Sequence, residues 1–386
     1  MKRRVTIIGG GVAGLTAAIG LLQIGLDVQV FERVAVLKGI GAGFGLAANA
    51  MRAFDLLGLR TGVEQIGHFL PSYNILDQHG NVLAEPDTKE ISKNYQQKNF
   101  AVHRADLHKF LHEQLPANIV HLGKEAIKFE RSPQGVRIFF SDQTVVETDA
   151  LIMADGVRSR LRQQLLPFAQ PRFSGYTCWR AVIDNRLVDL QSSTETWGPK
   201  GRFGMTPLAG NKVYWYACVN APQNSSKYRS FKVFDLQKHF ADYHTPIPQI
   251  LQNTSDELLL WNDIIDIEPL ASLAYGNILL IGDAGHATTP NLGQGACQAI
   301  EDVAVLVDEL TQNQQDFETA FAHVSTRRLR RTRYITETSW RVGKVAQWES
   351  PWLISIRNTL LRMMPNTLKQ LQLQKLLNED FMSITK

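Results

Sequence analysis

Cysteine is scarce in this 386-residue chain, which contains three: Cys178, Cys218 and Cys297. They are widely spaced and odd in number, so the sequence predicts neither a disulfide framework nor a cysteine-rich metal cluster. Few unpaired cysteines are typical of proteins in a reducing compartment. We therefore expect a cytoplasmic protein that binds no metal.

Long apolar runs and long basic runs are also missing. The chain has no stretch of about 18 consecutive apolar residues, so the sequence predicts no membrane-spanning helix. The N-terminal segment is unlike a secretion signal, because glycines interrupt its apolar stretch and no cleavage-like site follows. The formal net charge is only +4, and no basic run indicates binding to nucleic acid.

What the chain does have is an ordinary globular composition, with 44% hydrophobic and 20% charged residues. Its length suffices for two domains, or for one long α/β domain with an insertion. A full hydrophobic core is therefore expected.

Glycines gather in residues 9–14, which have the pattern Gly-x-Gly-x-x-Gly. The β-branched residues 5–8 precede this segment and the Ala- and Leu-rich residues 13–24 follow it, so it joins a strand to a helix. In such a turn the first glycine permits a tight bend, the second lets the backbone approach a pyrophosphate, and the third allows close helix packing. Glu32 ends the next expected strand, where a carboxylate binds ribose hydroxyls. Together these features predict a dinucleotide site.

Two later segments also join a buried strand to a helix. Asp155 and Gly156 follow the expected strand of residues 151–154; the alternative is that Asp155 and Ser159 only cap a helix. Asp283 follows the expected strand of residues 278–281, placed to accept hydrogen bonds from the polyol chain of a cofactor.

A further glycine-containing turn, residues 290–295, precedes the long helix expected at residues 295–310. The dipole of that helix would stabilise negative charge on a bound cofactor. Taken alone, each of these segments is an ordinary strand–turn–helix joint.

The character of the sheet patterns changes along the chain. Buried-strand patterns open it and return near residue 272, whereas residues 173–260 alternate and are rich in aromatic residues, as in an antiparallel sheet with one buried face. We therefore expect an α/β fold with a discontinuous cofactor domain and an inserted substrate domain. The expected ranges are 1–72, 98–170 and 272–330 for the cofactor domain, 73–97 and 171–271 for the substrate domain, and 331–386 for a C-terminal helical segment.

The sequence also predicts a hairpin around residues 79–81, strands at residues 126–129, 136–140 and 145–148, and a helical region from residue 326 with a break near Pro351. His286 is expected to be a local hydrogen-bonding residue rather than a catalytic base.

Together and in this order, the motifs resemble those of the group A flavoprotein monooxygenases, the para-hydroxybenzoate hydroxylase-like family. The resemblance covers nearly the whole chain. Residues 175–180 and 357–362 are similar to the branch of salicylate hydroxylase, zeaxanthin epoxidase and urate hydroxylase, and tetracycline-inactivating monooxygenases are related. The resemblance implies a Rossmann-like, glutathione reductase-type FAD-binding domain with an inserted, mostly antiparallel β-sheet substrate domain and C-terminal helices.

The resemblance also implies which residues contact FAD. Arg104 matches an arginine that reaches the cofactor, and Gly45 lies in the flavin-side loop of residues 41–46, although Ala48-Asn49 replaces the usual Pro-Asn. Arg33 lies over the adenine or is a solvated surface residue. The expected FAD contacts are Gly9, Gly11, Val12, Ala13, Gly14, Glu32, Arg33, Gly45, Arg104, Ala126, Asp155, Asp283, Pro290, Gly293, Gln294, Gly295 and Ala296.

In this family NADPH or NADH reduces FAD, and O2 then forms a flavin C4a-hydroperoxide that hydroxylates or epoxidises a small aromatic or polycyclic substrate. The cofactor carries the chemistry, so no catalytic side chain is assigned. By resemblance to urate hydroxylase, Arg202 would neutralise an anionic substrate and Tyr214 would orient it. The alternatives are a surface strand arginine and a half-buried sheet aromatic.

Other functions share these motifs. A flavin-dependent reductase of the geranylgeranyl-reductase type would saturate a double bond without consuming oxygen, and a non-catalytic flavin-binding protein would keep the fold alone. A halogenase is disfavoured because no Trp-x-Trp-x-Ile-Pro segment is present. The expected partners are a small organic substrate and O2, without nucleic acid, in a monomer or homodimer. The apolar tail of residues 340–381 could lie on a membrane, but packing on the domain is favoured.

Overall fold

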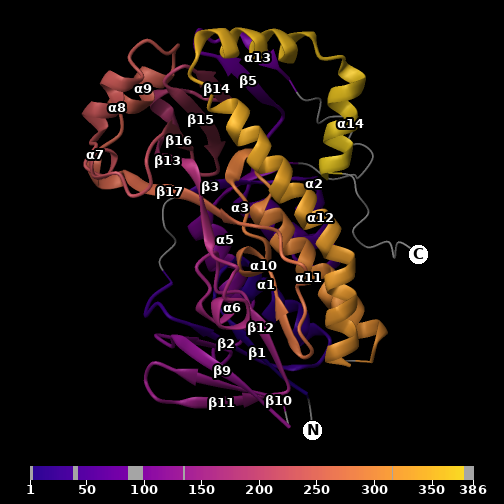
Figure 1. Cartoon of the computed structure of the whole chain (residues 1–386). Helices are drawn as coiled ribbons and strands as arrows, with labels where there is room; N and C mark the ends of the chain where they lie inside the picture. The colour runs from indigo at the N-terminus through magenta and orange to yellow at the C-terminus, as the bar shows by residue number, and fades with distance from the viewer. Residues whose placement is uncertain (1–2, 38–41, 86–98, 134, 315, 378–386) are drawn as a thin grey trace.

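The computed structural model describes residues 3–37, 42–85, 99–133, 135–314 and 316–377 (Figure 1). Helices and sheets are interleaved along the chain, and the fold is mixed α/β. The expectations that concern residue 41, residues 86–97 and residues 378–386 lie outside the described residues.

A five-stranded parallel sheet lies in the lower half of Figure 1, in the order β18-β12-β1-β2-β8. Its strands are β1 (Arg4–Ile8), β2 (Asp27–Glu32), β8 (Val120–Leu122), β12 (Ala150–Met153) and β18 (Ile278–Leu280). β12 and β18 are buried throughout, as is usual for parallel strands covered on both faces. Ile8 pairs with Met153 and Met153 pairs with Leu280. The three predicted motif turns therefore leave three adjacent strands at the same edge of the sheet.

Helices cover this sheet and share one hydrophobic core with it. α1 and α11 pack against each other, and α11 also contacts α2 and α12. The helices and short helical turns around the parallel sheet are α1 (Val12–Gln23), α2 (Ala48–Leu56), α3 (Arg60–Ile66), α5 (Arg104–Glu113), α6 (Arg160–Leu165), α10 (Asp283–His286), η3 (Pro290–Leu292) and α11 (Gly295–Gln312). The helices predicted after the first and last motif turns are confirmed.

Two small antiparallel sheets flank the parallel one. The first, in the order β11-β10-β9, confirms the strands expected after residue 125; the second has the order β3-β7-β4. Their strands are β9 (Ala126–Ser132), β10 (Gly135–Phe140), β11 (Val145–Thr148), β3 (Gly43–Leu46), β4 (His68–Phe69) and β7 (Phe100–His103).

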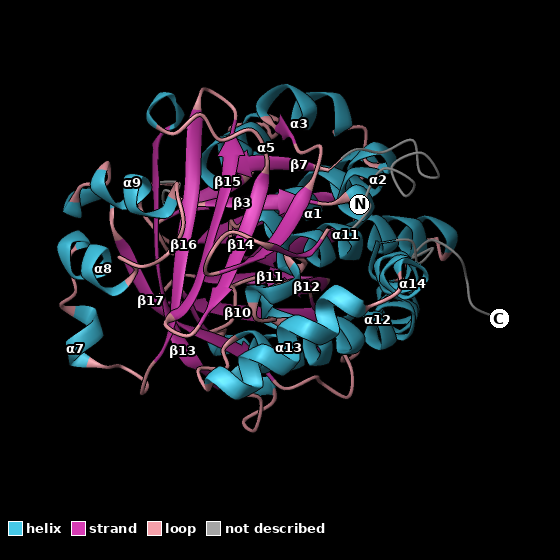
Figure 2. Ribbon diagram, turned by 90° about the horizontal axis from the view of Figure 1, so that it is seen from above, coloured by secondary structure: helices cyan, strands magenta, loops and turns pink. Residues whose placement is uncertain are grey.

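A seven-stranded sheet fills the upper part of the molecule, in the order β17-β13-β16-β15-β14-β5-β6 (Figure 2). All its pairings are antiparallel except that of β14 with β5. Its strands are β5 (Tyr73–Asp77), β6 (Val82–Ala84), β13 (Pro171–Asp184), β14 (Ser193–Gly198), β15 (Gly201–Leu208), β16 (Lys212–Asn220) and β17 (Leu260–Ile267). The hairpin predicted around residues 79–81 is present as β5 and β6.

Three short helices cover one face of this sheet, which we call the outer face. They are α7 (Ser226–Arg229), α8 (Val233–His239) and α9 (Ile247–Gln252), with the turns η1 (Asn185–Leu187) and η2 (Asp256–Leu258) nearby. Trp179, Phe203 and Trp215 pack there against Leu236 and Phe240. The sequence pattern did not predict these helices. Residues 226–252 contain aromatic residues, as the strands before and after them do, so the segment was assigned to the antiparallel sheet.

The C-terminal segment is helical, as predicted, but its first helix starts before residue 326. It comprises α12 (Phe317–Ala346), α13 (Pro351–Met363), which begins at the predicted break, and α14 (Asn366–Leu377). α13 contacts β6, and Arg362 forms an ion pair with Asp77 at 2.7 Å. The segment thus packs on the seven-stranded sheet, although Trp352 and Met363 remain exposed. Among the described residues, no helix combines the length and apolar character needed to cross a membrane.

Candidate active site

The glycine-rich turn after β1 is shaped by close contacts at two of its glycines. Gly9 has a φ of +109°, and a Cβ atom there would lie 2.3 Å from the carbonyl oxygen of Ala154. A Cβ on Gly14 would lie 1.9 Å from the carbonyl oxygen of Gly9. Gly11 differs, because a Cβ built on it meets no atom within 4 Å. Open space therefore lies beside Gly11 at the N-terminus of α1, where backbone N–H groups can receive a phosphate.

Glu32 lies at the end of β2, beside this turn. Its Oε2 accepts a hydrogen bond from Gly10 N at 2.7 Å, and its Oε1 accepts one from Val34 N at 3.0 Å. His108 of α5 donates from Nε2 to the carbonyl oxygen of Gly10. The carboxylate is thereby fixed next to the glycine-rich turn, and Arg33 is exposed beside it.

The turn after β12 carries both a helix cap and an unsatisfied carboxylate. Ser159 Oγ accepts a hydrogen bond from Arg162 N at 2.9 Å, so the capping role considered for this serine is confirmed. Within the described part of the chain, Asp155 Oδ1 is buried without a hydrogen-bond partner. Burial raises the pKa of Asp155, although Ser159 opposes the shift. A buried carboxylate oxygen of this kind favours a ligand that donates a hydrogen bond.

Arg162 of the same turn is completely buried. Its guanidinium donates to the carbonyl oxygens of Ala169 and Ala284, each at 3.1 Å. It therefore ties the Asp155 turn to α10, which carries Asp283, and acts as a positioning residue.

Asp283 begins α10 directly after β18. Gly282, which precedes it, has a φ of +55°, and a Cβ there would lie 3.0 Å from Ala13 Cβ and 3.2 Å from Ala299 Cβ. The turn is thus packed between α1 and α11, and only glycine fits this close approach in a left-handed conformation. Asp283 is held at the point where the first and third motifs meet.

Two more of the predicted FAD contacts, Arg104 and Gly295, lie near Asp283. Asp283 is exposed, but partial desolvation by the surrounding protein raises its pKa, while His286 and Arg104 oppose the shift. A Cβ built on Gly295, at the start of α11, would lie 4.0 Å from Asp283 Oδ1. The structure therefore brings Asp283, Arg104 and Gly295 together, from segments almost 200 residues apart.

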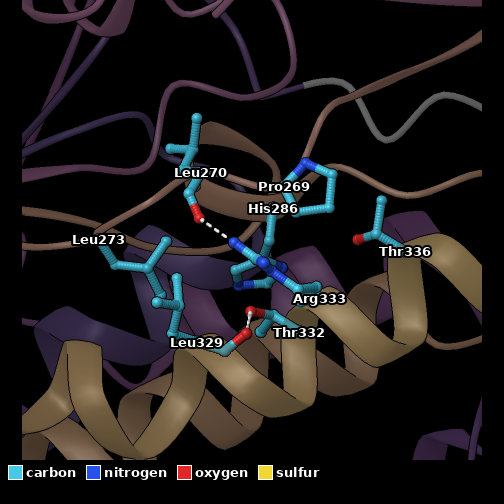
Figure 3. Close-up of a pocket in the computed structure, with 9 residues that line it drawn as sticks. Pro269, Leu270, Leu273, His286, Leu329, Thr332, Arg333 and Thr336 are labelled. Carbon is cyan, nitrogen blue, oxygen red and sulfur yellow. Dashed lines mark hydrogen bonds between the residues drawn. The ribbon is translucent and has the colours of Figure 1, made fainter.

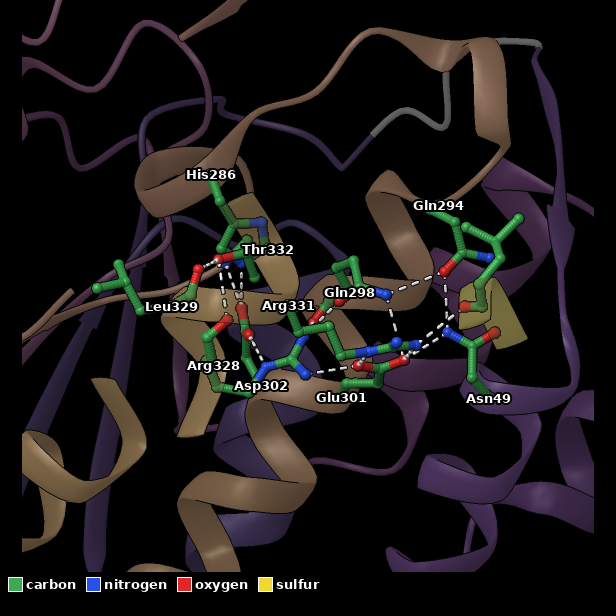
Figure 4. Close-up of polar contacts among 12 residues, drawn as sticks. Asn49, His286, Gln294, Gln298, Glu301, Asp302, Arg328, Leu329, Arg331 and Thr332 are labelled. Atoms are coloured by element: carbon green, nitrogen blue, oxygen red, sulfur yellow. Dashed lines mark hydrogen bonds and ion pairs between the residues drawn. The ribbon is translucent and has the colours of Figure 1, made fainter. Parts of the chain in front are cut away.

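A network of buried charges holds this region in place (Figure 4). Asp302 of α11 accepts hydrogen bonds from Gly282 N at 2.9 Å and from His286 Nε2 at 2.6 Å, and pairs with Arg328 Nε at 2.7 Å. His286 is thus a local hydrogen-bonding residue, as expected. Burial would raise the pKa of Asp302, but His286 and Arg328 outweigh it and lower that pKa.

The network continues to the turn that starts α11. Glu301 pairs with Arg328 and Arg331 of α12, and Asn49 of α2 donates both to Glu301 and to Gln294 Oε1. Gln294 is buried, so its side chain supports the turn from behind. These bonds fix the backbone of residues 290–296, which the sequence predicted to face the cofactor.

A small pocket lies between α10 and α12 (Figure 3). It is lined by Pro269, Leu270, Leu273, Gly285, His286, Leu329, Thr332, Arg333 and Thr336. Arg333 Nη2 donates to the carbonyl oxygen of Leu270 across it at 3.4 Å. The pocket borders α10 through Gly285 and His286, and none of the predicted FAD contacts is among its lining residues.

The face of the seven-stranded sheet opposite α7–α9, here called the inner face, is aromatic and polar. Alternation along β13, β15 and β16 puts Arg180, Arg202, Tyr214 and Tyr216 on it. Tyr214 is half-buried, and a Cβ on Gly43 of β3 would lie 2.9 Å from its ring carbon Cγ. The inner face therefore meets β3, and residues 43–46 of the predicted flavin-side loop form this strand.

A second contact joins the inner face to the turn before α11. Tyr176 of β13 donates from its hydroxyl to Asn291 Oδ1 of η3 at 3.0 Å. The guanidinium of Arg202 lies over the ring of Tyr176, 5.2 Å from its centroid. Arg202 is thus one aromatic ring away from the predicted cofactor turn.

Arg202 is nevertheless not a surface residue, and that alternative is wrong: it is 2% exposed. Its Nη1 pairs with Glu195 Oε1 of β14 at 3.0 Å, and its Nε donates to Gln347 Oε1 at 2.9 Å. Tyr73 and Tyr216 each donate from the hydroxyl to Glu195 Oε2, at 2.7 and 2.9 Å. The charge of Arg202 is already balanced by protein.

Comparison with known proteins identifies the cofactor that these motifs serve. Residues 2–317 match the family described as FAD binding domain. The chain belongs to this family.

Comparison with individual proteins of known activity shows what kind of reaction this chain catalyses. Aurachin C monooxygenase/isomerase of Stigmatella aurantiaca is 35% identical over 367 residues, which cover 94% of this chain and 95% of the relative. The 2-heptyl-3-hydroxy-4(1H)-quinolone synthase of Pseudomonas aeruginosa is 33% identical over 377 residues, covering 96% and 97%. The crystal structure of Klebsiella pneumoniae HpxO complexed with FAD and uric acid has a TM-score of 0.91 at 26% identity and 97% coverage of both chains. The chain is an FAD-dependent monooxygenase, and this favours oxygenation over the reductase and non-catalytic alternatives.

Several residues of the site were missed by sequence analysis. Glu195 and Tyr73 come from ordinary strand patterns that carry no motif, so no local signal marks them. Tyr176 lies in the segment 175–180 that resembles the family, but no role was assigned to it. Glu301 and Asp302 did leave a signal, because two adjacent acidic residues in the middle of an apolar helix need buried partners.

Proposed function

We propose that this FAD-dependent monooxygenase uses NADPH or NADH and O2 to hydroxylate a fused heteroaromatic ring bound at the inner face. The observation that carries the proposal is the meeting of the three motif turns at one sheet edge, opposite a face lined by Tyr214 and Tyr216. The finer assignment of a Rossmann-like, glutathione reductase-type FAD-binding domain is part of this proposal. The domain boundaries are also part of this proposal. The FAD-binding domain comprises residues 1–72, 98–170 and 272–330, the substrate domain comprises residues 73–97 and 171–271, and residues 331–386 form a C-terminal helical segment.

The residues present fit FAD at this edge. Gly11 would leave space for the pyrophosphate at the N-terminus of α1, Glu32 would bind a ribose hydroxyl, and Asp283 would accept hydrogen bonds from the polyol chain. The buried, unpartnered Asp155 Oδ1 supplies a further acceptor. Bound there, FAD would supply transfer of two electrons from the nicotinamide and activation of O2.

The protein's own contribution is electrostatic and steric. The N-terminus of α11 at Gly295 stabilises negative charge, because its backbone N–H groups are not used within the helix. Asp302 and Glu301 hold the turns that present Gly295 and Asp283. The aromatic inner face excludes water and orients a flat ring, and Tyr214 is the proposed orienting residue.

A fused ring is favoured over a single one by the relatives that match nearly the whole chain. The compound in the name of the Pseudomonas relative, 2-heptyl-3-hydroxy-4(1H)-quinolone, is a bicyclic heteroaromatic with an alkyl chain. We therefore take 2-heptyl-4(1H)-quinolone, which lacks the 3-hydroxyl, as the first candidate substrate, with salicylate and urate as smaller alternatives.

Isotope labelling tests the proposal directly. Holoprotein is mixed with NADPH or NADH and each candidate under ¹⁸O2, and products are analysed by mass spectrometry. We expect one ¹⁸O atom in a hydroxylated product and nicotinamide oxidation that rises when the substrate is added. A product that has gained two hydrogens and no oxygen would instead establish the reductase function, and nicotinamide oxidation without any labelled product would refute this substrate class.

A further inference from the structure

We propose that Glu195 is a specificity-determining residue, which neutralises Arg202 and thereby lowers the affinity of the inner face for anionic aromatic rings relative to uncharged ones. This inference rests on the proposed function, because it concerns the substrate bound at the same inner face. It replaces the anion-neutralising role that the sequence suggested for Arg202.

The ion pair is built into the sheet. In the β14–β15 hairpin, Glu195 pairs with Gly204 and Trp197 pairs with Arg202, so Glu195 and Arg202 are diagonal neighbours on one face. Both side chains are at most 4% exposed. A pair that is buried in this way is weakly screened by water and salt.

The carboxylate of Glu195 is saturated with donors. It accepts hydrogen bonds from Arg202 Nη1 at 3.0 Å, Tyr73 Oη at 2.7 Å and Tyr216 Oη at 2.9 Å. Burial raises the pKa of Tyr73 and of Tyr216 well above the usual value, and the negative charge of Glu195 raises both further. Both phenols therefore remain neutral donors to the side chain of Glu195.

Gly204 makes this arrangement possible. A Cβ at position 204 would lie 2.1 Å from Tyr216 Cζ, so the ring of Tyr216 crosses β15 in the space that a side chain would take. The hydroxyl then reaches Glu195 on the next strand. Tyr214 lies beside Tyr216 with ring centroids 5.9 Å apart, and together they form the aromatic wall of the inner face.

The charges on this wall decide which ligand it accepts. An anion next to Arg202 would also lie next to Glu195, and two negative charges at such distances repel strongly away from water. The other cation of the inner face is Arg180, a diagonal neighbour of Tyr214 that forms no ion pair with any described residue. Its guanidinium can bind a carboxylate or a polarised carbonyl oxygen. Because Glu195 neutralises Arg202, the inner face offers an anion one positive charge in place of two.

Two ligands that differ only in charge test the inference. They are 4(1H)-quinolone-2-carboxylate and the corresponding 2-carboxamide, and their binding to the oxidised holoprotein is measured by the change in flavin absorbance and by calorimetry. The salicylate and salicylamide pair repeats the comparison with one ring. In each pair, the ratio of carboxylate affinity to amide affinity is measured for the wild type and compared with that of the variants.

Three variants move this ratio in directions set by the proposal. Glu195→Gln frees the charge of Arg202 and should shift the preference toward the carboxylate by at least about tenfold. Glu195→Gln combined with Arg202→Gln removes both charges and should restore the wild-type ratio. Arg202→Gln alone leaves Glu195 unpaired, should weaken carboxylate binding further, and provides the test if Glu195→Gln does not retain FAD. Glu268→Gln, at an exposed carboxylate, is the control and should change nothing.

The outcomes separate this inference from the proposed function. An unchanged ratio in a flavin-loaded Glu195→Gln variant overturns the role of Glu195 and leaves the monooxygenase proposal intact. If none of the four ligands binds, an aromatic substrate at this face is refuted, and both proposals fail together.

Discussion

Two glycines of the first turn, Gly11 and Gly14, are alike in sequence and opposite in surroundings. Gly14 is required by the protein itself, because a methyl group there would overlap the carbonyl oxygen of Gly9. Gly11 has open space where its side chain would be. At this scale the fold explains Gly14, whereas the proposed contact with FAD is needed to explain Gly11.

Replacing Gly11 by Ala therefore separates cofactor binding from folding. We expect a folded protein whose affinity for FAD falls at least about tenfold, because the added methyl group intrudes only on the path of the pyrophosphate. Flavin content and calorimetric titration of the apoprotein with FAD measure the effect. Gly14→Ala is the matched comparison and should lower the free energy of unfolding; full FAD occupancy in Gly11→Ala would contradict the placement of the cofactor.

At the scale of elements, the register of the strands and the capping of the helices determine where the side chains of the site lie. β15 brings Gly204 under the ring of Tyr216, so that two neighbouring strands share one polar cluster. α6 starts at a serine cap, so the turn that carries Asp155 is fixed by the helix that follows it.

Gly204→Ala should displace the ring of Tyr216 and break its hydrogen bond to Glu195. We expect a loss of about 1–3 kcal/mol in the free energy of unfolding, which is the usual cost of overpacking a closed site. Urea unfolding monitored by tryptophan fluorescence measures it. Tyr216→Phe is the control for the lost hydrogen bond without overpacking, and equal stability of Gly204→Ala and wild type would mean that the ring does not cross β15.

Ser159→Ala removes the side-chain acceptor at the start of α6. The variant should lose about 1 kcal/mol of stability, the typical value of an N-cap. Ser159→Thr keeps the hydroxyl and should stay within a few tenths of the wild type. Thermal unfolding followed by circular dichroism distinguishes the two, and an unaffected Ser159→Ala variant would show that the cap contributes nothing here.

At the scale of the whole molecule, the buried charges of α11 and α12 join parts that are distant in sequence. Arg331 bonds both to Glu301 and to the carbonyl oxygen of Leu376 in α14, and Arg328 bonds to Glu301 and Asp302. Breaking a buried pair by removing one partner is costly, since the other charge remains buried. The network thus couples the cofactor turns to the C-terminal helices.

Arg328→Met should therefore lower the free energy of unfolding by about 3–5 kcal/mol at neutral pH. Flavin retention should fall as well, because Asp302 would no longer hold Gly282 N in the same way. Chemical unfolding and FAD release on dilution measure the two effects. Arg330→Met, at an exposed position of the same helix, is the matched control and should behave like the wild type.

The same network makes stability depend on pH in acid. Burial would raise the pKa of Glu301, but Arg331 and Arg328 outweigh it and lower that pKa below 4.5; His286 and Arg328 likewise lower the pKa of Asp302 below 3.8. Folding then favours the ionised forms, so their contribution is complete above about pH 5 and is lost as pH falls through the lowered values. Unfolding free energies measured from pH 7 to pH 3 should fall more steeply for wild type than for a Glu301→Gln, Asp302→Asn variant.

The sequence by itself determined the local features of this protein. The glycine-rich turn, the strands before Asp155 and Asp283, and the break at Pro351 were predicted because each depends on residues within one or two turns of the chain. The family resemblance then indicated FAD and oxygen chemistry. By contrast, α7–α9 were missed, because their aromatic residues serve the outer face of a sheet that the pattern alone does not locate.

Only the tertiary structure decided how charge is distributed in the site. Arg202 could be a surface residue or an anion receptor as long as its partner, Glu195, was unknown. The register of the β14–β15 hairpin brings Glu195 next to Arg202. Tyr73, which lies 122 residues before Glu195 in the sequence, holds that carboxylate by a hydrogen bond. Likewise, Asp302 and Arg328 meet only because α11 and α12 pack side by side. Motifs are read within a segment, whereas the neutralisation of a buried charge depends on which segments come into contact.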